Sequence, residues 1–273
     1  MESKQGTLTL VGTPIGNSAD ITQRAVEALQ NADVIACEDT RRSLPFLLGR
    51  GVKKPLVSYH KHNEKSGAEY LVQLLSEGKD VALITDAGMP GISDPGAEAV
   101  RLARSVGIRV TCAPGPTALT TALALAGIEG AFTFLGFLPE KLKDKRAILQ
   151  AFKNVPSALV FYISPHDIQK QLDFLHEELG ERKLTLAREI TKMFEEVQEG
   201  VLGEIRIDRP RGEYVAIVHA PEGEEIPEPN KLLRALLASG EDKKSAIKEV
   251  AARCKLPRDA VYKMALNMRD ERS

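Results

Sequence analysis

The chain of 273 residues is long enough for two domains of ordinary size, and 43% hydrophobic with 27% charged residues is the composition of a globular protein with a sizeable core. No apolar run approaches the roughly 18 residues that a membrane helix needs, and the amino terminus lacks the apolar core of a signal peptide. These features exclude a membrane protein and predict a cytoplasmic location. Three distant cysteines without a CxxC pair predict neither a disulfide framework nor a zinc site.

The net charge of -1 hides an asymmetry along the chain. Residues 228–273 hold 11 Lys and Arg against 7 Asp and Glu, whereas residues 1–227 hold 26 against 31. A basic C-terminal segment favours a polyanionic partner. Because the surplus is modest, a merely solvated helical surface is the competing interpretation.

Short apolar runs alternate with helical patterns in the first half of the chain, which predicts a parallel α/β sheet. Helices are expected after an N-cap at Ser18, over residues 64–77 and over about 95–106. The first two strands should be joined by a right-handed parallel crossover. The expected strands lie near residues 7–12, 33–37, 81–84 and 108–112, and residues 56–64 are expected to form a short third strand that runs into a polar loop.

Residues 84–96, ITDAGMPGISDPG, form the most distinctive stretch of the sequence. Its glycines and prolines indicate an irregular loop that can hold its amide and carbonyl groups open to a ligand. Asp86 and Asp94 lie in this loop, at the carboxyl end of a predicted buried strand, where open α/β sheets bind ligands. A long surface turn is the alternative.

A Pro-Gly-Pro bend at residues 114–116 marks a boundary, and Thr117 is well placed as the N-cap of the helix that follows. That helix is apolar all round, so we expect it to be buried between two halves of the protein. The second half should form a mixed α/β sheet, with residues 197–207 and 213–219 paired to each other around a DRPRG turn. Its other elements are expected at residues 132–139, 140–152, 158–163, 164–179 and 183–189.

A Pro-rich segment then leads into three expected helices, at residues 230–239, 243–254 and 257–268. The last two resemble a helix-turn-helix, which favours nucleic-acid contact, although three-helix bundles without that role share the pattern. Their small core is expected to contain Ile247, Val250, Ala251, Leu256, Val261 and Leu266.

Familiar ligand motifs are missing from this chain. The turn GTPIGN follows the first strand, but there is no G-x-G-x-x-G, no Walker A sequence and no acidic residue before a GxGxG. A nucleotide-dependent oxidoreductase is therefore disfavoured. His60 and His62 could share one side of a strand, but no third ligand lies nearby, so no metal site is predicted.

Eight segments in order resemble one family, the 16S ribosomal RNA cytidine 2′-O-methyltransferases, a branch of the tetrapyrrole-methylase-like fold. The likeness covers about residues 6–220 strongly and the C-terminal segment more loosely. The segments are GTPIGN at 12–17, EDTR at 38–41, SYHKHNE at 58–64, TDAGMPGISDPG at 85–96, PGPTALTTALALAG at 114–127, GFLP at 136–139, FYISPHDI at 161–168 and AREITKMFEE at 187–196.

The resemblance implies two α/β domains, at residues 1–113 and 114–222, with a helical tail at 228–273. It also implies a homodimer that binds S-adenosylmethionine in the cleft between the domains and methylates 16S ribosomal RNA of the small subunit. Asp86-Ala87-Gly88 departs from the tetrapyrrole enzymes, which have a proline after the aspartate. The residues expected to contact the methyl donor are Pro14, Gly16, Asp86, Gly88, Met89, Thr117, Ala118, Tyr162 and Ala216.

Methyl transfer to a ribose hydroxyl is an in-line displacement, in which a base or a cation near the hydroxyl assists. Alternatively, Arg41 and Lys192 hold RNA phosphates while Glu38 and Glu189 form ion pairs that support the fold. The candidates for a direct catalytic role, all expected at strand ends facing the cleft, are Asp39, Arg41, His60, Asn63, Glu189 and Lys192.

Two other functions stay open. A tetrapyrrole methyltransferase would share the fold, but a small macrocycle gives no reason for a basic helical tail. A DNA-binding regulator with the α/β part as its sensor would use the helix-turn-helix pattern.

Overall fold

Two five-stranded sheets build the larger part of the protein. The computed structural model describes residues 5–221, 229–254 and 256–270. Met1–His219 and Ala220–Ser273 form two separate units, and both sheets belong to the first.

The first sheet is entirely parallel, as predicted, with the strand order β3-β2-β4-β1-β5. Because the strands run in one direction, the loops after β1, β2 and β4 all leave the same edge of the sheet. These loops carry the turns GTPIGN, EDTR and TDAGMP. The strands are β1 (Thr7–Val11), β2 (Val34–Cys37), β3 (Leu56–Ser58), β4 (Val81–Leu83) and β5 (Arg109–Ala113).

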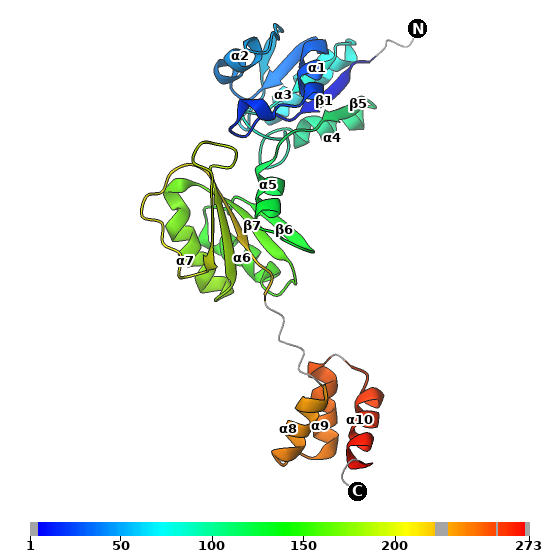
Figure 1. Ribbon diagram of the computed structural model, residues 1–273. Helices are drawn as coiled ribbons and strands as arrows, with labels where there is room; N and C mark the ends of the chain where they lie inside the picture. The colour runs from blue at the N-terminus through cyan, green and yellow to red at the C-terminus, as the bar shows by residue number, and fades with distance from the viewer. Residues whose placement is uncertain (1–4, 222–228, 255, 271–273) are drawn as a thin grey trace. The chain divides into compact units, whose positions relative to one another are not determined.

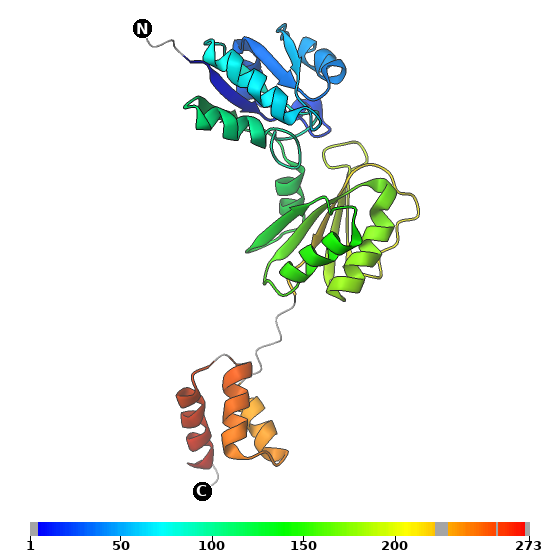
Figure 2. The same cartoon turned by 180° about the vertical axis from the view of Figure 1, so that it is seen from behind.

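Helices cover both faces of the first sheet (Figures 1 and 2). Helices α1 (Gln23–Asn31) and α2 (Thr40–Leu48) pack on one face. Helices α3 (Glu64–Ser76) and α4 (Ala97–Ser105) pack on the other. Successive strand side chains point to opposite faces, so β2 and β4 are buried on both sides and read as continuous apolar runs.

The second sheet is mixed, with the order β6-β7-β10-β8-β9 and a single parallel pair, β6 with β7. One face carries helices α6 and α7, and the other carries α5. The fold class predicted from the sequence is therefore confirmed. The elements are α5 (Ala118–Leu125), β6 (Phe132–Gly136), α6 (Leu142–Phe152), β7 (Ala158–Ile163), α7 (Ile168–Leu179), β8 (Lys183–Arg188), β9 (Glu196–Val201) and β10 (Tyr214–Val218).

Two expectations about pairing and helix starts are wrong. β10 does not pair with β9: it is fully buried between β7 and β8, as its unbroken apolar sequence YVAIV requires, whereas the polar strand β9 lies at the sheet edge. The first α-helix does not start after Ser18. Ser18–Asp20 is a separate 3₁₀ turn capped by Asn17, and Thr22 caps α1.

Helix α5 is not buried all round, contrary to the expectation from its composition. Ala122 and Leu123 are buried against the second sheet, whereas Ala124 is exposed and Leu125 is 44% exposed. The sheet can cover only one face of a helix. The outer face of α5 is therefore apolar and open to solvent in the single chain.

The second unit consists of α8 (Pro229–Ala238), α9 (Lys243–Arg253) and α10 (Arg258–Asp270), which share a core around Leu233. Of the predicted core residues, Ile247, Val250, Ala251 and Val261 are buried. Leu256 is partly buried against the same core. The side chain of Leu266 lies outside the described part of the chain. Among the described residues, no helix is long and apolar enough to cross a membrane.

Candidate active site

A cavity of about 430 Å³ opens at the carboxyl edge of the first sheet, against residues of the second half of the chain. Its walls come from segments far apart in sequence and include the loop of residues 84–96, where the sequence predicts a ligand site. The lining residues are Ile15, Glu38, residues 86–89, residues 92–94, Thr117, Ala118, Phe137, residues 162–165, Ile190 and residues 213–215.

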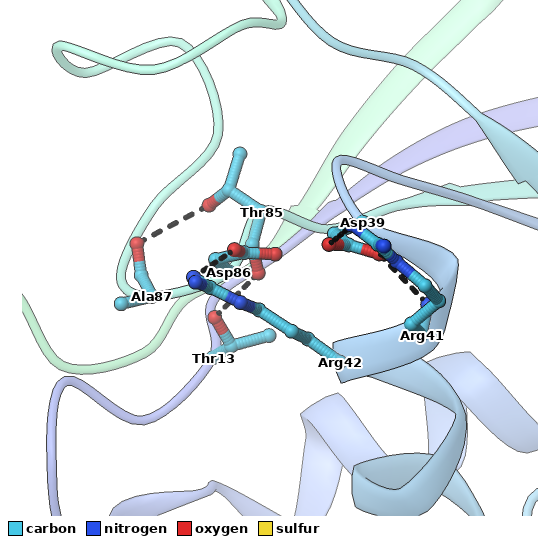
Figure 3. Close-up of polar contacts among 7 residues, drawn as sticks. All are labelled: Thr13, Asp39, Arg41, Arg42, Thr85, Asp86 and Ala87. Carbon is cyan, nitrogen blue, oxygen red and sulfur yellow. Dashed lines mark hydrogen bonds and ion pairs between the residues drawn. The ribbon is translucent and has the colours of Figure 1, made fainter.

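Backbone hydrogen bonds fix the loops after β1 and β4 to each other. Thr13 and Gly88 exchange two bonds, of 2.9 Å from Thr13 N to Gly88 O and 3.1 Å from Gly88 N to Thr13 O. Thr13 Oγ1 also donates to the carbonyl of Thr85 at 3.1 Å, and Thr85 Oγ1 donates to the carbonyl of Ala87 at 3.2 Å (Figure 3). Gly88 has a φ of 78°, a conformation that glycine adopts without strain. The cavity therefore has a preformed floor.

Two glycines let the Pro-Gly-Pro bend approach this floor. A Cβ on Gly12 would lie 2.6 Å from the backbone nitrogen of Gly115 and 2.7 Å from Met89 Sδ. A Cβ on Gly115 would lie 2.9 Å from the backbone of Gly12. Only residues without side chains fit at this crossing.

Neighbouring arginines at the start of α2 have different partners (Figure 3). Arg41 turns back to Asp39, the N-cap of its own helix, with Arg41 Nη2 2.8 Å from Asp39 Oδ2. Hydrogen bonds from Arg41 lower the pKa of Asp39 to about 2, so this carboxylate is a weak base. Arg42 instead reaches across to the β4 loop, with Nη1 2.8 Å from Asp86 Oδ2.

Four carboxylates line the cavity: Glu38, Asp86, Asp94 and Glu213. Although Asp94 is exposed to solvent, partial burial in the crevice and the charges of the other three raise its pKa to about 6. A wall of this kind attracts a cation. Asp94 should give up its remaining proton when one binds.

Tyr162 joins the cavity to the start of α5. Its Oη accepts a hydrogen bond of 3.1 Å from the backbone N–H of Leu119, one of the amides that a helix N-terminus leaves without an intrahelical partner. The ring makes edge contacts with Phe134 and Phe137, at centroid distances of 5.0 and 5.5 Å. Partial burial raises the pKa of Tyr162, so the phenol is protonated at neutral pH.

A second cavity, of about 400 Å³, shares part of its wall with the first. The shared residues are Ile15, Asp86, Ala87 and Glu213. Arg42 and Lys192 contribute its basic side chains. The two hollows therefore form adjacent compartments of one crevice.

Lys192 lies in the turn between β8 and β9, with its Nζ 2.7 Å from Glu189 Oε1 and 3.4 Å from Glu213 Oε2. Partial burial by itself would lower the pKa of this amine, but the hydrogen bonds and charges of both glutamates raise it. The same hydrogen bond lowers the pKa of Glu189. Lys192 is therefore a cation at neutral pH and not a proton acceptor.

The residues expected to contact the donor mostly meet at this crevice. The larger cavity is lined by Asp86, Gly88, Met89, Thr117, Ala118 and Tyr162, and the second by Pro14, Gly16 and again Asp86. Ala216 lies in the centre of β10, fully buried, and lines neither cavity.

The six candidates for a direct role are more dispersed. Lys192 lines the second cavity, and Glu189 forms an ion pair with Lys192. Asp39 and Arg41 pair with each other, and neither lines a cavity. His60 and Asn63 close the turn after β3. There the Asn63 side chain accepts from His60 N at 2.8 Å and donates to Ser58 O at 3.1 Å.

Among the charged lining residues, Arg42, Asp94 and Glu213 were not candidates for donor contact or catalysis, and Glu38 was considered only for an ion pair that supports the fold. Asp94 lay within a loop that the sequence already marked as a ligand site. Successive residues of a helix point about 100° apart, so only one of the neighbouring residues Arg41 and Arg42 can face the crevice, but this spacing does not say which one. Glu213 gave no signal in the sequence.

Comparison with known proteins identifies the family. The tetrapyrrole (corrin/porphyrin) methylases match residues 7–206. A Bacillus subtilis protein named ribosomal RNA small subunit methyltransferase I is 38% identical over 275 residues, covering 96% of this chain and 94% of that protein. The chain belongs to the ribosomal RNA small subunit methyltransferase I family. It is therefore a methyltransferase, and the resemblance inferred from its motifs is confirmed.

Two further comparisons concern the family and the fold. A member from Coprothermobacter proteolyticus with the same name is 45% identical over 210 residues, which cover 77% of this chain but 96% of that protein. The crystal structure of the methyltransferase CobJ superposes with a TM-score of 0.62 at 20% identity, covering 80% of this chain and 95% of that one. CobJ shares the fold, and nothing about substrates follows from that similarity.

Proposed function

We propose that this methyltransferase moves a methyl group from S-adenosylmethionine to the ribose 2′-hydroxyl of a cytidine in 16S ribosomal RNA of the small subunit. The observation that carries the proposal is the pair of adjacent cavities, one walled by carboxylates and the other bearing Arg42 and Lys192. A cationic donor suits the first, and a polyanionic acceptor suits the second. The names of the relatives support ribosomal RNA as that acceptor.

The larger cavity fits the donor in size and chemistry. About 430 Å³ lies in the range of small-molecule sites, and S-adenosylmethionine carries a net positive charge that the four carboxylates would attract. When bound, the donor supplies an electrophilic methyl group. Asp86 and Asp94 would hold its charged part, while Met89, Ala118 and Tyr162 offer contact area for its less polar part.

Lys192 is the residue we assign to the acceptor hydroxyl. Its ammonium, held in place by Glu189 and Glu213, would stabilise the negative charge that develops on the oxygen during transfer. The oxygen–methyl bond would form as the sulfur–methyl bond breaks, and the hydroxyl proton would pass to solvent. Binding of an RNA phosphate by Lys192 remains the competing role from the sequence. Arg42 replaces Arg41 as the phosphate ligand in this proposal, because Arg41 lies outside both cavity linings.

The decisive experiment incubates the protein with labelled S-adenosylmethionine and small subunits that lack the modification. We expect label on RNA, located by nuclease mapping at a cytidine 2′-oxygen. Label on a base would contradict the 2′-oxygen assignment, and transfer to a tetrapyrrole instead of RNA would contradict the substrate class. Duplex DNA binding without any methyl transfer would favour the regulator alternative.

We propose that the helical tail strengthens RNA binding through phosphate contacts. The exposed basic side chains are Lys244, Lys248, Arg258 and Lys263. The Nζ of Lys243 lies over the ring of Tyr262, 5.5 Å from its centroid. Deleting residues 228–273 should weaken binding to small subunits and lower the slope of log affinity against log salt. An unchanged slope would contradict this role. Because residues 220–273 belong to a separate unit and none of its described residues lines either cavity, the truncated protein should still bind the donor.

We further propose a cytoplasmic homodimer with domains at residues 1–113 and 114–222. The apolar outer face of α5 and Phe132, which is 46% exposed on edge strand β6, support a contact between two copies. Replacing Leu125 with Glu should shift the molar mass in light scattering from two chains to one. A protein that modifies the small subunit would work where ribosomes are assembled, which supports the location.

A further inference from the structure

Met193 and Phe194 are the most exposed of the large apolar side chains at the active-site edge. They are 89% and 70% exposed, at the tip of the turn of residues 189–195 between β8 and β9. Two adjacent side chains of this kind expose apolar surface that folding does not use. Neither side chain lines the cavities described above. These exposed side chains are therefore available to contact another molecule.

This turn is braced rather than loose. Ile190 is buried against the core of the second sheet. Thr191 Oγ1 accepts a hydrogen bond of 3.1 Å from Asn17 N, in the loop after β1, and Thr191 N donates to Glu195 Oε2 at 2.6 Å. A Cβ on Gly16 would lie 2.5 Å from Lys192 Cγ, which shows how closely the turn packs on that loop.

Backbone strain marks the same turn. Glu189 and Thr191 have positive φ values of 49° and 68°. A β-branched residue in this region is an outlier that persists only where the surrounding structure holds it. These contacts hold successive residues in different directions. Ile190 packs in the core, Lys192 lines the second cavity, and Met193 and Phe194, which directly follow Lys192, are exposed to solvent.

The geometry points to a stacking platform: we propose that Met193 and Phe194 bind the unpaired base of the nucleotide whose ribose enters the second cavity. The inference rests on the proposed function and deepens it, since Lys192 would contact the sugar while the residues directly after it contact the base. A nucleotide that has left the stack can insert its ribose into a crevice, whereas a stacked one presents its 2′-hydroxyl only at the groove surface. A flat apolar surface then compensates the base for the lost stacking, as aromatic side chains do in single-strand recognition.

Kinetics with small subunits test the platform. F194A should lower kcat/KM for subunits about 10- to 100-fold, the equivalent of one lost base–aromatic contact, while the donor Kd stays within about twofold. F194W should restore most of the rate and F194L only part of it. L142A, which removes a 55% exposed leucine at the start of α6, is the matched control and should leave kcat/KM unchanged.

The outcomes separate this inference from the proposed function. If the unaltered protein methylates subunits and F194A does so equally well, the platform is wrong and the proposed function stands. Full rescue by F194L would also overturn it, because an aliphatic side chain does not reproduce aromatic stacking. If the unaltered protein transfers no methyl group to RNA, the proposed function fails first.

Photo-crosslinking identifies what the platform contacts. The variant Phe194→p-benzoylphenylalanine, irradiated with small subunits, should crosslink to 16S RNA, near the modified nucleotide. A crosslink to a ribosomal protein or to a second copy of this chain would overturn the assignment, as would no crosslink at all. Leu142→p-benzoylphenylalanine is the control and should not label RNA near that nucleotide.

Discussion

Replacing Tyr162 with Phe isolates one hydrogen bond at the cavity wall. The change keeps the ring and its contacts with Phe134 and Phe137, but removes the oxygen that accepts from Leu119 N at 3.1 Å. An unsatisfied buried N–H costs about 1–3 kcal/mol, and this one is only partly buried, so we expect a loss of about 1 kcal/mol in the free energy of unfolding. For a unit of this size that is a fall of roughly 2–4 °C in Tm.

The protein contains a matched control for this substitution. Tyr59 Oη accepts a hydrogen bond of 3.2 Å from Ala99 N at the start of α4, the same arrangement in the first sheet, but its ring is 1% exposed and lines neither cavity. Y59F should therefore destabilise by about 1–3 kcal/mol, at least as much as Y162F. Only Y162F should change the binding of the methyl donor.

Calorimetric titration with S-adenosylmethionine and thermal unfolding measure the two effects separately. We expect Y162F to weaken donor binding about 3- to 10-fold, the size of one hydrogen bond or of a small shift of the α5 N-terminus. Y59F should leave donor affinity within about twofold. Equal donor affinities for both variants, at unequal stabilities, would refute the assignment of Tyr162 to the donor wall.

Four further changes probe the remaining parts of the crevice. Because the raised pKa of Asp94 is about 6 and a cationic donor favours the ionised carboxylate, donor affinity should rise as pH rises through 6, and D94N should flatten that profile in titrations from pH 5 to 8. A profile unchanged in D94N would reject the assignment. G12A should lower the free energy of unfolding, measured by denaturant titration, by about 1–3 kcal/mol, because its Cβ would lie 2.6 Å from the backbone nitrogen of Gly115. The variant should also bind the donor more weakly. G49A, whose Cβ would make only ordinary contacts at 3.4 Å, is its control. K192A should lower kcat at least 10-fold with the donor Kd unchanged. R42A should raise KM for subunits more than R41A, and the reverse order would restore Arg41 to the site.

The alternation of apolar runs and helical patterns was enough to predict the strands, the parallel first sheet and the mixed second sheet. Which strands pair with each other was harder to predict from the sequence. β10 carries the unbroken apolar run YVAIV, which is typical of a central strand, but adjacency in sequence favoured pairing it with β9. The prediction for helix α5 failed for another reason: its apolar composition indicated burial on every side, but the second sheet covers only one face of the helix.

Side-chain direction limited the prediction of the site. The glycine and proline loops located the crevice because their backbones are constrained locally, and eight of the nine residues expected to contact the donor line one of the two cavities. The polar candidates depended on rotamers and on partners distant in sequence. Asn63 bonds within its own turn, Arg41 bonds to its own helix cap, and the neighbouring Arg42 reaches Asp86 in another loop. No local pattern distinguishes these outcomes.

Two unfavourable features meet at this edge of the molecule, and the proposed ligands would account for both. Partial burial and the neighbouring carboxylates raise the pKa of Asp94, and the turn of residues 189–195 holds Thr191 at a positive φ. Repulsion and strain of this kind lower the stability of the free protein and persist where the fold around them is rigid. A cation in the first cavity would relieve the repulsion. The strain in the turn would instead serve the proposed RNA acceptor, because the brace that imposes it would hold Lys192 and Phe194 in position before that acceptor binds.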